Sequence, residues 1–469
     1  MVASSTVGDG LRPGEEIGNE DQIETPLPFG PMLAVASIQL CEAFNILMLF
    51  PFVYFMVVDF LPPESEQWAG LYAGIIGAMW PFGQFITSAL WGDAADRFGR
   101  RPTLLLGTLG TSLVAPVFGF SGSILMAALT RLFGGALNGN VAVMKAVIGD
   151  ITDDSNRARG YSICIVMYGL GSTFGPTLGG FLANSADREI FKNIPFVQSS
   201  VFKSYPYLLP CLAQCIVGLI SFTIIAVALP ETYSAENRSH SRLPSDDVDT
   251  GDEMHIELSG DQHHHVQDKR VMRAILVYSL TALAWVIYDE TFPLLCASPP
   301  DVGGLGLNSS EIGCALAVSG IAAIVFQLVL FPMIEKRYEI PVLFRASGVT
   351  AACAFLFLPI SGIWISVNAK LSWTLLLIAV CVQISAACAC FACILMLVNN
   401  SANAQNRGAV NAKGQAMAAF ARACGPFLSG MLWSFSVRNS NIPGHQWIPF
   451  SVAAAAILSA AVASSKFST

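Results

Sequence analysis

Long apolar runs separated by short polar segments constrain this chain more than any other feature of its sequence. Twelve runs each approach the roughly 20 residues that a helix needs to cross a bilayer. Only 12% of the residues are charged, against about 25% in a typical soluble domain. The sequence therefore predicts an all-α polytopic membrane protein with twelve transmembrane helices. The predicted spans are 32–58, 67–90, 102–120, 124–148, 160–183, 206–229, 271–297, 309–334, 342–366, 372–398, 409–436 and 447–465.

Polar segments divide these spans into two halves. We expect a disordered cytoplasmic tail at 1–30, a six-helix half at 31–229, a cytoplasmic linker at 230–270 and a second six-helix half at 271–466. Lysine and arginine favour the loops on one side, fourteen against five, which places both termini in the cytoplasm. We expect the membrane to be either the plasma membrane or the vacuolar membrane.

The two halves also repeat a short pattern. Asn156-Arg157 precedes Gly175-Pro176 by 19 residues, and Asn406-Arg407 precedes Gly425-Pro426 by the same 19 residues. An internal duplication of six spans plus six is the organisation of parallel transporter halves.

A charged segment, residues 91–101, lies between the second and third spans. Its order Gly-x-x-x-Asp-Arg-x-Gly-Arg-Arg resembles the loop between helices 2 and 3 of the major facilitator superfamily of secondary transporters. The resemblance implies the major facilitator fold and a latch that holds the two halves together on the cytoplasmic side. We expect the glycines to let the chain turn there. The predicted gating loop comprises Gly92, Asp96, Arg97, Gly99, Arg100 and Arg101.

The fifth span carries glycines on one face. Gly171, Gly175 and Gly179 recur every four residues, and Pro176 interrupts the backbone ladder. The stretch from Gly171 to Gly180 resembles the antiporter signature of the drug/proton antiporter branch, which implies contact with the other half and restricted leakage. The alternative is a generic helix contact through small residues. Gly425 and Pro426 repeat part of this pattern in the second half.

Polar residues also recur within the fourth span. Arg131, Asn138 and Lys145 are spaced by seven, so a continuous helix would present all three on one face. The motif around Arg131 resembles the family's fourth-helix motif, whose arginine is linked to proton coupling. Charges inside a membrane are costly and imply a wet cavity or acidic partners. For Lys145, a snorkelling position near the cytoplasmic end is the alternative.

Three acids complete the proton-coupling candidates. Glu42 lies deep in the first span, and our preferred pairing joins it to Arg131 or Lys145. Asp289 and Glu290 lie in the outer half of the seventh span, where a position at the rim is the alternative.

We expect a substrate cavity at the midplane, lined by spans 1, 4, 7 and 10. Its mixture of aromatic and polar residues suits an amphipathic organic molecule. The predicted cavity residues are Phe44, Asn45, Asn138, Trp285, Tyr288 and Gln383.

Over nearly its whole length the chain resembles the zinc-induced-facilitator-like and fungal multidrug members of the antiporter branch. It lacks the cysteine signature that the plant members carry before their first helix. No Gly-x-x-x-x-Gly-Lys-Ser/Thr loop for ATP is present, so we expect an ion gradient to supply the energy. The sequence predicts a monomeric proton-coupled antiporter of a small molecule, embedded in a lipid bilayer, with no cofactor, no resident metal and no nucleic-acid partner.

Three rival functions stay open: a facilitator or symporter of organic anions or metal chelates, a substrate sensor that does not transport, and a membrane-embedded enzyme. No motif that pairs a histidine with an acid occurs within a span, so an enzyme is the least favoured of the three. The linker holds His240, His255 and the run His263–His265. This run is either a metal-sensing loop or a solvated polar loop.

Overall fold

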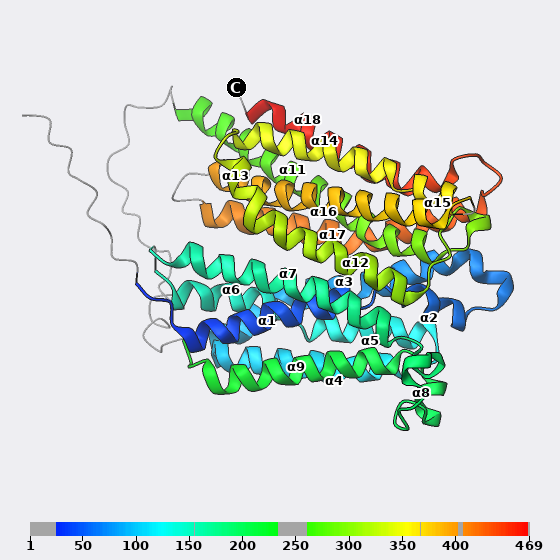
Figure 1. Ribbon diagram of the computed structural model, residues 1–469. Coiled ribbons are helices and arrows are strands. Elements are labelled where there is room, and N and C mark those ends of the chain that lie inside the picture. The colour runs from blue at the N-terminus through cyan, green and yellow to red at the C-terminus, as the bar shows by residue number, and fades with distance from the viewer. Residues whose placement is uncertain (1–24, 154, 233–259, 366, 402–406, 468–469) are drawn as a thin grey trace, which may run out of the picture.

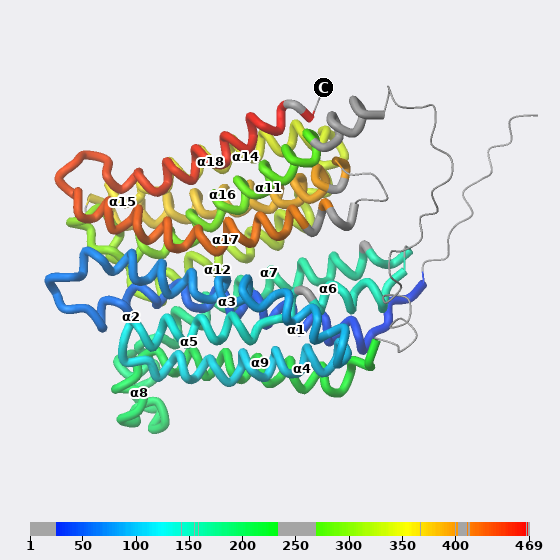
Figure 2. Tube along the Cα trace, turned by 180° about the vertical axis from the view of Figure 1, so that it is seen from behind, coloured from blue at the N-terminus to red at the C-terminus, as the bar shows by residue number. Residues whose placement is uncertain are grey.

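A computed structural model describes residues 25–153, 155–232, 260–365, 367–401 and 407–467 of the chain. The regular structure of these residues is helical throughout. They form two bundles that lie side by side, with the chain up to residue 232 in one and the chain from residue 260 in the other (Figures 1 and 2).

The first bundle packs mainly through α4 on α9, α1 on α7, and α3 on α5. Its helices are α1 (Phe29–Leu47), α2 (Val53–Phe60), α3 (Ala69–Phe98), α4 (Arg100–Gly119), α5 (Ile124–Ala136), α6 (Asn140–Ile151), α7 (Arg157–Leu182), α8 (Ser200–Ser204) and α9 (Leu208–Ala228). Three short 3-10 helices join them: η1 (Pro63–Trp68), η2 (Ser185–Asp187) and η3 (Glu189–Phe191).

The second bundle packs mainly through α11 on α17 and α18, and through α14 on α16 and α18. Its helices are α11 (Gly260–Ala297), α12 (Ser309–Val325), α13 (Phe331–Glu335), α14 (Ile340–Phe357), α15 (Ile360–Trp364), α16 (Ala369–Asn400), α17 (Arg407–Arg438) and α18 (Ile448–Ser464). The short elements are η4 (Pro300–Val302), the π-helical turn η5 (Phe326–Leu330), η6 (His445–Trp447) and η7 (Ser465–Phe467).

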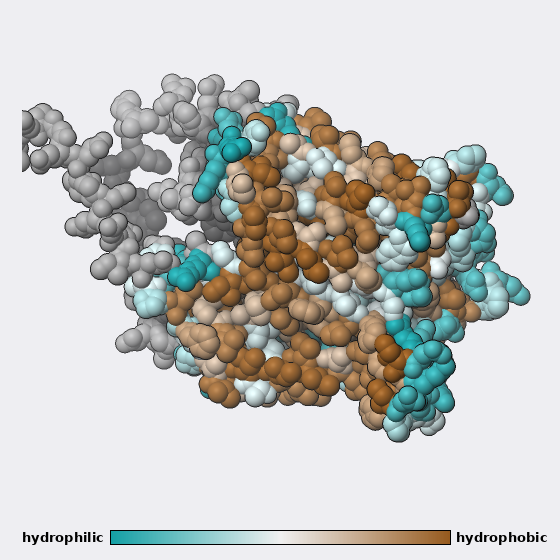
Figure 3. Space-filling model, in the orientation of Figure 1, coloured by the Kyte–Doolittle hydropathy of each residue, from teal (hydrophilic) through white to brown (hydrophobic). Residues whose placement is uncertain are grey.

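Apolar surface covers the middle of the molecule. Eight helical segments among the described residues are long and apolar enough to cross a membrane. The short apolar helix α5, its continuation α6, and α3, α7 and α17 also run along the bundles (Figure 1). Brown hydrophobic side chains cover the middle of the face in Figure 3, and teal hydrophilic ones gather beyond it. Such a band needs lipid around it rather than water.

Two predicted spans are interrupted. The first span, expected to be continuous over 32–58, consists of α1 and α2 with a turn around Pro51, which has no N–H to offer the helix ladder. The fourth span, expected over 124–148, stops at Ala136 and restarts at Asn140. The single face predicted for Arg131, Asn138 and Lys145 is therefore wrong, because Asn138 lies in the break.

The charged segment at 91–101 is also more helical than expected. Helix α3 continues to Phe98, so Gly92, Asp96 and Arg97 belong to its last turns. The turn occurs at Gly99 alone, where φ is +103°, a conformation that side chains with a Cβ rarely adopt. Glu231 then caps the next helix, because its carboxylate accepts hydrogen bonds from the backbone N–H groups of Arg100 (3.0 Å) and Arg101 (3.2 Å).

The bundles meet along two seams, α3 against α17 and α7 against α12. Both seams depend on glycine. A Cβ added at Gly430 of α17 would lie 3.0 Å from the Cα of Gly74 in α3, and one at Gly180 of α7 would lie 3.1 Å from the Cα of Gly313 in α12. At this separation the helix backbones themselves are in contact.

Candidate functional site

The break in the fourth span holds a buried acid. Asn138 donates a hydrogen bond to the carboxylate of Glu42 (2.9 Å), and Asn140 donates a longer one to its other oxygen (3.5 Å). All three side chains are buried, with at most 4% of their surface exposed. Glu42 thus makes its hydrogen bonds with two neutral amides, and the preferred pairing with Arg131 or Lys145 is not what the structure shows.

Helix α3 stabilises this break. The carbonyl oxygen of Ala136, released from the helix ladder, accepts hydrogen bonds from the Trp91 indole (2.8 Å) and from the Thr87 hydroxyl (2.9 Å). Gly139 then lets the chain pass the Trp91 ring, because any Cβ there would collide with it. Irregular backbone at membrane depth needs such partners. In transporters, broken helices of this kind are where binding sites are built.

Arg131 is buried beside this break but faces another way. It donates a hydrogen bond to the backbone oxygen of Asn45 (3.3 Å), and its guanidinium lies 4.6 Å from the centre of the Trp80 ring. Its Nε atom is buried and finds no hydrogen-bond partner among the described residues. Lys145, by contrast, is an exposed residue of α6.

The neighbouring acids of α11 point to different places. Asp289 lines a cavity between the bundles. Glu290 is buried against α3, where its carboxylate lies 2.8 Å from the position that a Cβ of Gly77 would take. Glu290 is the acid of the opposite half whose charge bears on Arg131. No ion pair joins these two side chains in the described part of the chain.

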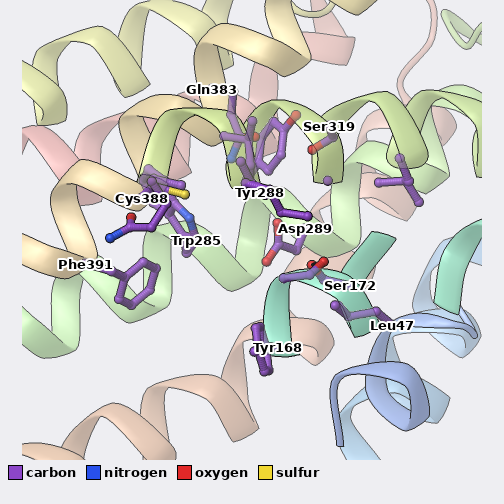
Figure 4. A pocket seen from close by; sticks show the side chains of 18 of the residues that line it. Leu47, Tyr168, Ser172, Trp285, Tyr288, Asp289, Ser319, Gln383, Cys388 and Phe391 are labelled. Atoms are coloured by element: carbon purple, nitrogen blue, oxygen red, sulfur yellow. Dashed lines mark hydrogen bonds between the residues drawn. The ribbon is translucent and has the colours of Figure 1, made fainter. Parts of the chain in front are cut away.

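The cavity has a volume of about 450 Å³. In Figure 4, α11 contributes Trp285, Tyr288 and Asp289, and α16 contributes Gln383, Cys388 and Phe391. Tyr168 and Ser172 of α7, Leu47 of α1 and Ser319 of α12 complete the labelled wall. A mainly apolar chamber with a few polar groups suits an amphipathic molecule.

The cavity contains half of the substrate residues expected from the sequence. Trp285, Tyr288 and Gln383 line it, whereas Phe44, Asn45 and Asn138 do not. The expected lining by spans 1, 4, 7 and 10 also differs from the observed one, because α5 and α6 contribute no residue while α7, α12 and α17 do.

Several polar lining residues were not among the predicted sites, and two of them carry functional groups of particular interest. Tyr168 of α7 and Arg422 of α17 face the cavity. Their sequence signal is weak: Tyr168 lies three residues before the Gly-Ser-Thr stretch, and Arg422 lies in a helix rich in alanine and glycine.

Two of the predicted gating residues, Arg100 and Arg101, contact other helices of their own half. Arg100 forms an ion pair with Asp150 of α6 and donates to the Ala146 carbonyl oxygen (2.8 Å), and Arg101 donates to the Ala226 carbonyl oxygen of α9 (2.6 Å). Asp96 is exposed. A latch between the halves stays a prediction for another conformation of the protein.

The glycine stripe of α7 likewise differs from its expected role. Gly171 and Gly179 pack on backbone oxygens of α1, and Gly175 packs on Phe44 of that helix, so this face contacts the same half. Contact with α12 of the other half is made by Gly180 and by the carbonyl oxygen of Pro176. The reason is helical geometry, since Gly180 lies about 100° around the helix from Gly179.

The second half repeats this division. Gly425 packs against Val286 of α11 in its own half. The carbonyl oxygen of Pro426 instead meets Gly74 of α3 across the seam.

Two helical bundles around a shared cavity, each with glycine contacts to the other, define a transporter-type membrane protein. Comparison with known proteins identifies the class. The model of the Major Facilitator Superfamily matches residues 35–367, and the chain belongs to this family. It is a transporter with the family's twelve transmembrane helices in two six-helix halves, as the sequence predicted, and not an enzyme.

Curated relatives span nearly the whole chain. Protein ZINC INDUCED FACILITATOR-LIKE 1 of Arabidopsis thaliana is 31% identical and covers 93% of this chain, with 91% of its own length matched. The multidrug transporter mfsB of Aspergillus fumigatus is 27% identical, with 89% of this chain and 80% of its own length matched. These relatives agree with the resemblance drawn from the motifs.

A solved structure matches the fold. The crystal structure of a D-xylose-proton symporter superposes with a TM-score of 0.70 at 16% identity, covering 94% of this chain and 98% of its own. Identity this low supports the fold alone.

Metal binding has no support from the described residues, among which no group of three or more His, Cys, Asp or Glu side chains could hold an ion. The side chains of His240, His255 and His263–His265 lie outside the described part of the chain.

Proposed function

We propose that this transporter exports a small organic molecule in exchange for protons by alternating access, and that Glu42 is the proton-carrying group. The observation that carries the proposal is the buried carboxyl at the break between α5 and α6. Its two hydrogen-bond donors are neutral amides of Asn138 and Asn140. An amide NH₂ group can donate to a carboxylate and equally to the carbonyl oxygen of a carboxylic acid. The two amides bind different oxygens of Glu42, so a proton on one oxygen leaves the other as a carbonyl that still accepts its hydrogen bond.

Coupling needs communication between this acid and the other half. Arg131 contacts the backbone of Asn45, one helical turn from Glu42, and its charge interacts with Glu290 of α11. Helix α11 also carries Asp289 into the cavity. Substrate that contacts α11 and a proton that binds Glu42 of α1 therefore act on adjoining elements. Exchange requires that these two binding events influence each other.

The proposal extends to topology. We place both termini, the tail at 1–30 and the linker at 230–270 in the cytoplasm, and we expect a monomer in the plasma or vacuolar membrane. In this orientation the outer portion of the α3–α17 seam is closed, since Gly70 and Gly74 in the first turns of α3 meet Gly430 in the C-terminal third of α17.

A second candidate is transport of organic anions without proton exchange. Arg422 on the cavity wall favours it, because an arginine facing a mainly apolar chamber can pair with a carboxylate. The two candidates differ in whether substrate movement carries protons.

The test uses proteoliposomes that contain a panel of small organic cations, neutral compounds and anions, together with an internal pH dye. Wild-type protein should release a compound while protons enter. Glu42→Gln should abolish transport driven by the pH gradient yet keep substrate exchange, because exchange needs alternating access without net proton movement. Glu64→Gln is the matched control, since Glu64 is an exposed acid of η1.

If Glu42→Gln still couples substrate transport fully to proton movement, Glu42 is not the proton-carrying group. Asp289 and Glu290 then become the candidates. Substrate movement without any proton flux in the wild type would favour the anion facilitator.

A further inference from the structure

A groove on the surface of the second bundle combines two cations with an apolar wall. It lies between α11 and α18 and encloses about 710 Å³. Lys269 and Arg273 line it together with Met272, Leu276, Leu458 and Val462. Figures 1 and 2 both place the last turns of α18 beside the early turns of α11, at the end of the bundle near the C-terminus.

Helical spacing brings these groups together. Lys269, Met272, Arg273 and Leu276 are separated by three or four residues, so they share one face of α11. Lys269 begins the membrane-compatible part of this helix, which runs from Lys269 to Ala297. The positive end of the groove therefore lies at the membrane boundary, and its apolar wall continues toward the hydrocarbon.

The apolar wall is open to its surroundings. Met272 is 67% exposed, Leu276 52% and Val462 72%. In a bilayer such a surface is covered by an acyl chain, which fills an irregular groove at little cost. A pair of cations at headgroup depth then selects among lipids by charge, because basic pockets between helices bind anionic headgroups.

We propose that this groove is a binding site for an anionic phospholipid, with its phosphate at Lys269 and Arg273 and one acyl chain along Met272, Leu276, Leu458 and Val462. Lys269 reaches the phosphate as a flexible point charge, and Arg273 adds a second permanent positive charge beside it. The site is separate from the substrate cavity, with which it shares no lining residue.

The test is native mass spectrometry of the full purified chain in detergent. Phosphatidylglycerol and phosphatidylcholine with identical acyl chains are the two probes. Wild-type protein should retain phosphatidylglycerol more strongly. The double variant Lys269→Gln/Arg273→Gln should lower its affinity about thirtyfold, since each of the two basic groups contributes about 1 kcal/mol near an anionic surface, while phosphatidylcholine binding stays unchanged.

Matched controls separate this site from general surface charge. Lys336→Gln/Arg337→Gln removes two exposed basic residues that follow α13 and lie outside the groove, and it should leave phosphatidylglycerol binding unchanged. Val462→Trp keeps both charges but fills the groove, and it should weaken phosphatidylglycerol binding severalfold. Size-exclusion profiles equal to the wild type establish that each variant is folded.

Three outcomes would overturn the proposal: unchanged phosphatidylglycerol binding in the Lys269/Arg273 variant, equal loss in the Lys336/Arg337 variant, or unchanged binding in Val462→Trp. Competition by glycerol phosphate as strong as by the whole lipid would show a site for a free anion, and would likewise reject a lipid site.

Discussion

The two seams between the halves share one backbone design but differ in charge. Gly430 meets Gly70 and Gly74 where α17 crosses α3, and Gly180 meets Ser309 and Gly313 where α7 crosses α12. The preceding prolines, Pro426 and Pro176, each turn a carbonyl oxygen to the opposite helix. Residues 250 positions apart thus make equivalent contacts, as expected for an internal repeat.

Charge breaks this symmetry. Glu290 of α11 is buried beside the α3–α17 seam, against Gly77 of α3. In the α7–α12 seam, Gly320 instead packs on Thr173, a neutral side chain. Close packing is thus duplicated, whereas a buried acid lies beside the α3–α17 seam and the charged group of the α7–α12 seam is Arg188 at its end. We expect the duplicated part to serve movement and the unique part to serve coupling.

The largest expected effect comes from filling either seam. Gly74→Leu and Gly180→Leu should each lower transport at least about tenfold, because overpacking costs about 1–3 kcal/mol and here no side chain can move aside for the new one. Gly149→Leu is the control, since nothing lies within 4 Å of its Cβ position. Initial rates in proteoliposomes at equal protein amounts give the comparison. Tolerance of leucine in one seam alone would show that the two seams are not equivalent.

The sequence predicted the bundles well and their contacts less well. Apolar runs determine how many helices cross the bilayer, because length and hydropathy are properties of each segment alone. Breaks depend on partners instead: the interruption before Asn140 exists because Trp91 and Thr87 bind the free Ala136 carbonyl oxygen.

The sequence also could not predict the direction in which each buried side chain points. Glu42 and Arg131 were both singled out, yet Glu42 binds Asn138 and the charge of Arg131 interacts with Glu290. Which acid meets which base depends on how the helices are rotated and on the contact between halves. A single sequence carries no record of either.

An intermediate effect should come from the charge asymmetry itself. Glu290→Gln leaves the Arg131 charge buried without its acidic neighbour, and thermal unfolding in detergent should occur several degrees lower. Arg131→Met alone should also destabilise. The double variant should recover part of the loss, because neither charge is then left uncompensated.

Asp289→Asn is the matched control for this cycle. Asp289 lines the cavity instead of the seam, so its variant should change substrate affinity more than unfolding temperature. Strict additivity of Glu290→Gln and Arg131→Met would refute the coupling across the seam.

The smallest expected effect concerns two arginines that join the halves near the seam ends. Arg188 donates hydrogen bonds to the Gly180 carbonyl oxygen (2.8 Å) and to the Ser309 hydroxyl (3.1 Å) of α12, and it also contacts Ser310. Arg438 of α17 lies 4.4 Å from the Trp68 ring centre and makes a cation–π contact. Charged hydrogen bonds contribute about 1.5–3 kcal/mol and exposed cation–π contacts about 0.5–1. Loss of Arg188 should therefore matter more.

Hydrogen exchange measured by mass spectrometry checks this order. Arg188→Ala should speed amide exchange at the start of α12 by about tenfold, and Arg438→Ala should speed exchange around Trp68 only a few-fold. Arg345→Ala, in a helix within the second bundle, should change neither region. Because these contacts close the ends of the seams, both variants should favour separation of the halves there. A larger increase in exchange rate in Arg438→Ala than in Arg188→Ala would contradict this order. It would mean that the α3–α17 seam is held chiefly at its end and that the buried Glu290 contributes little to its closure.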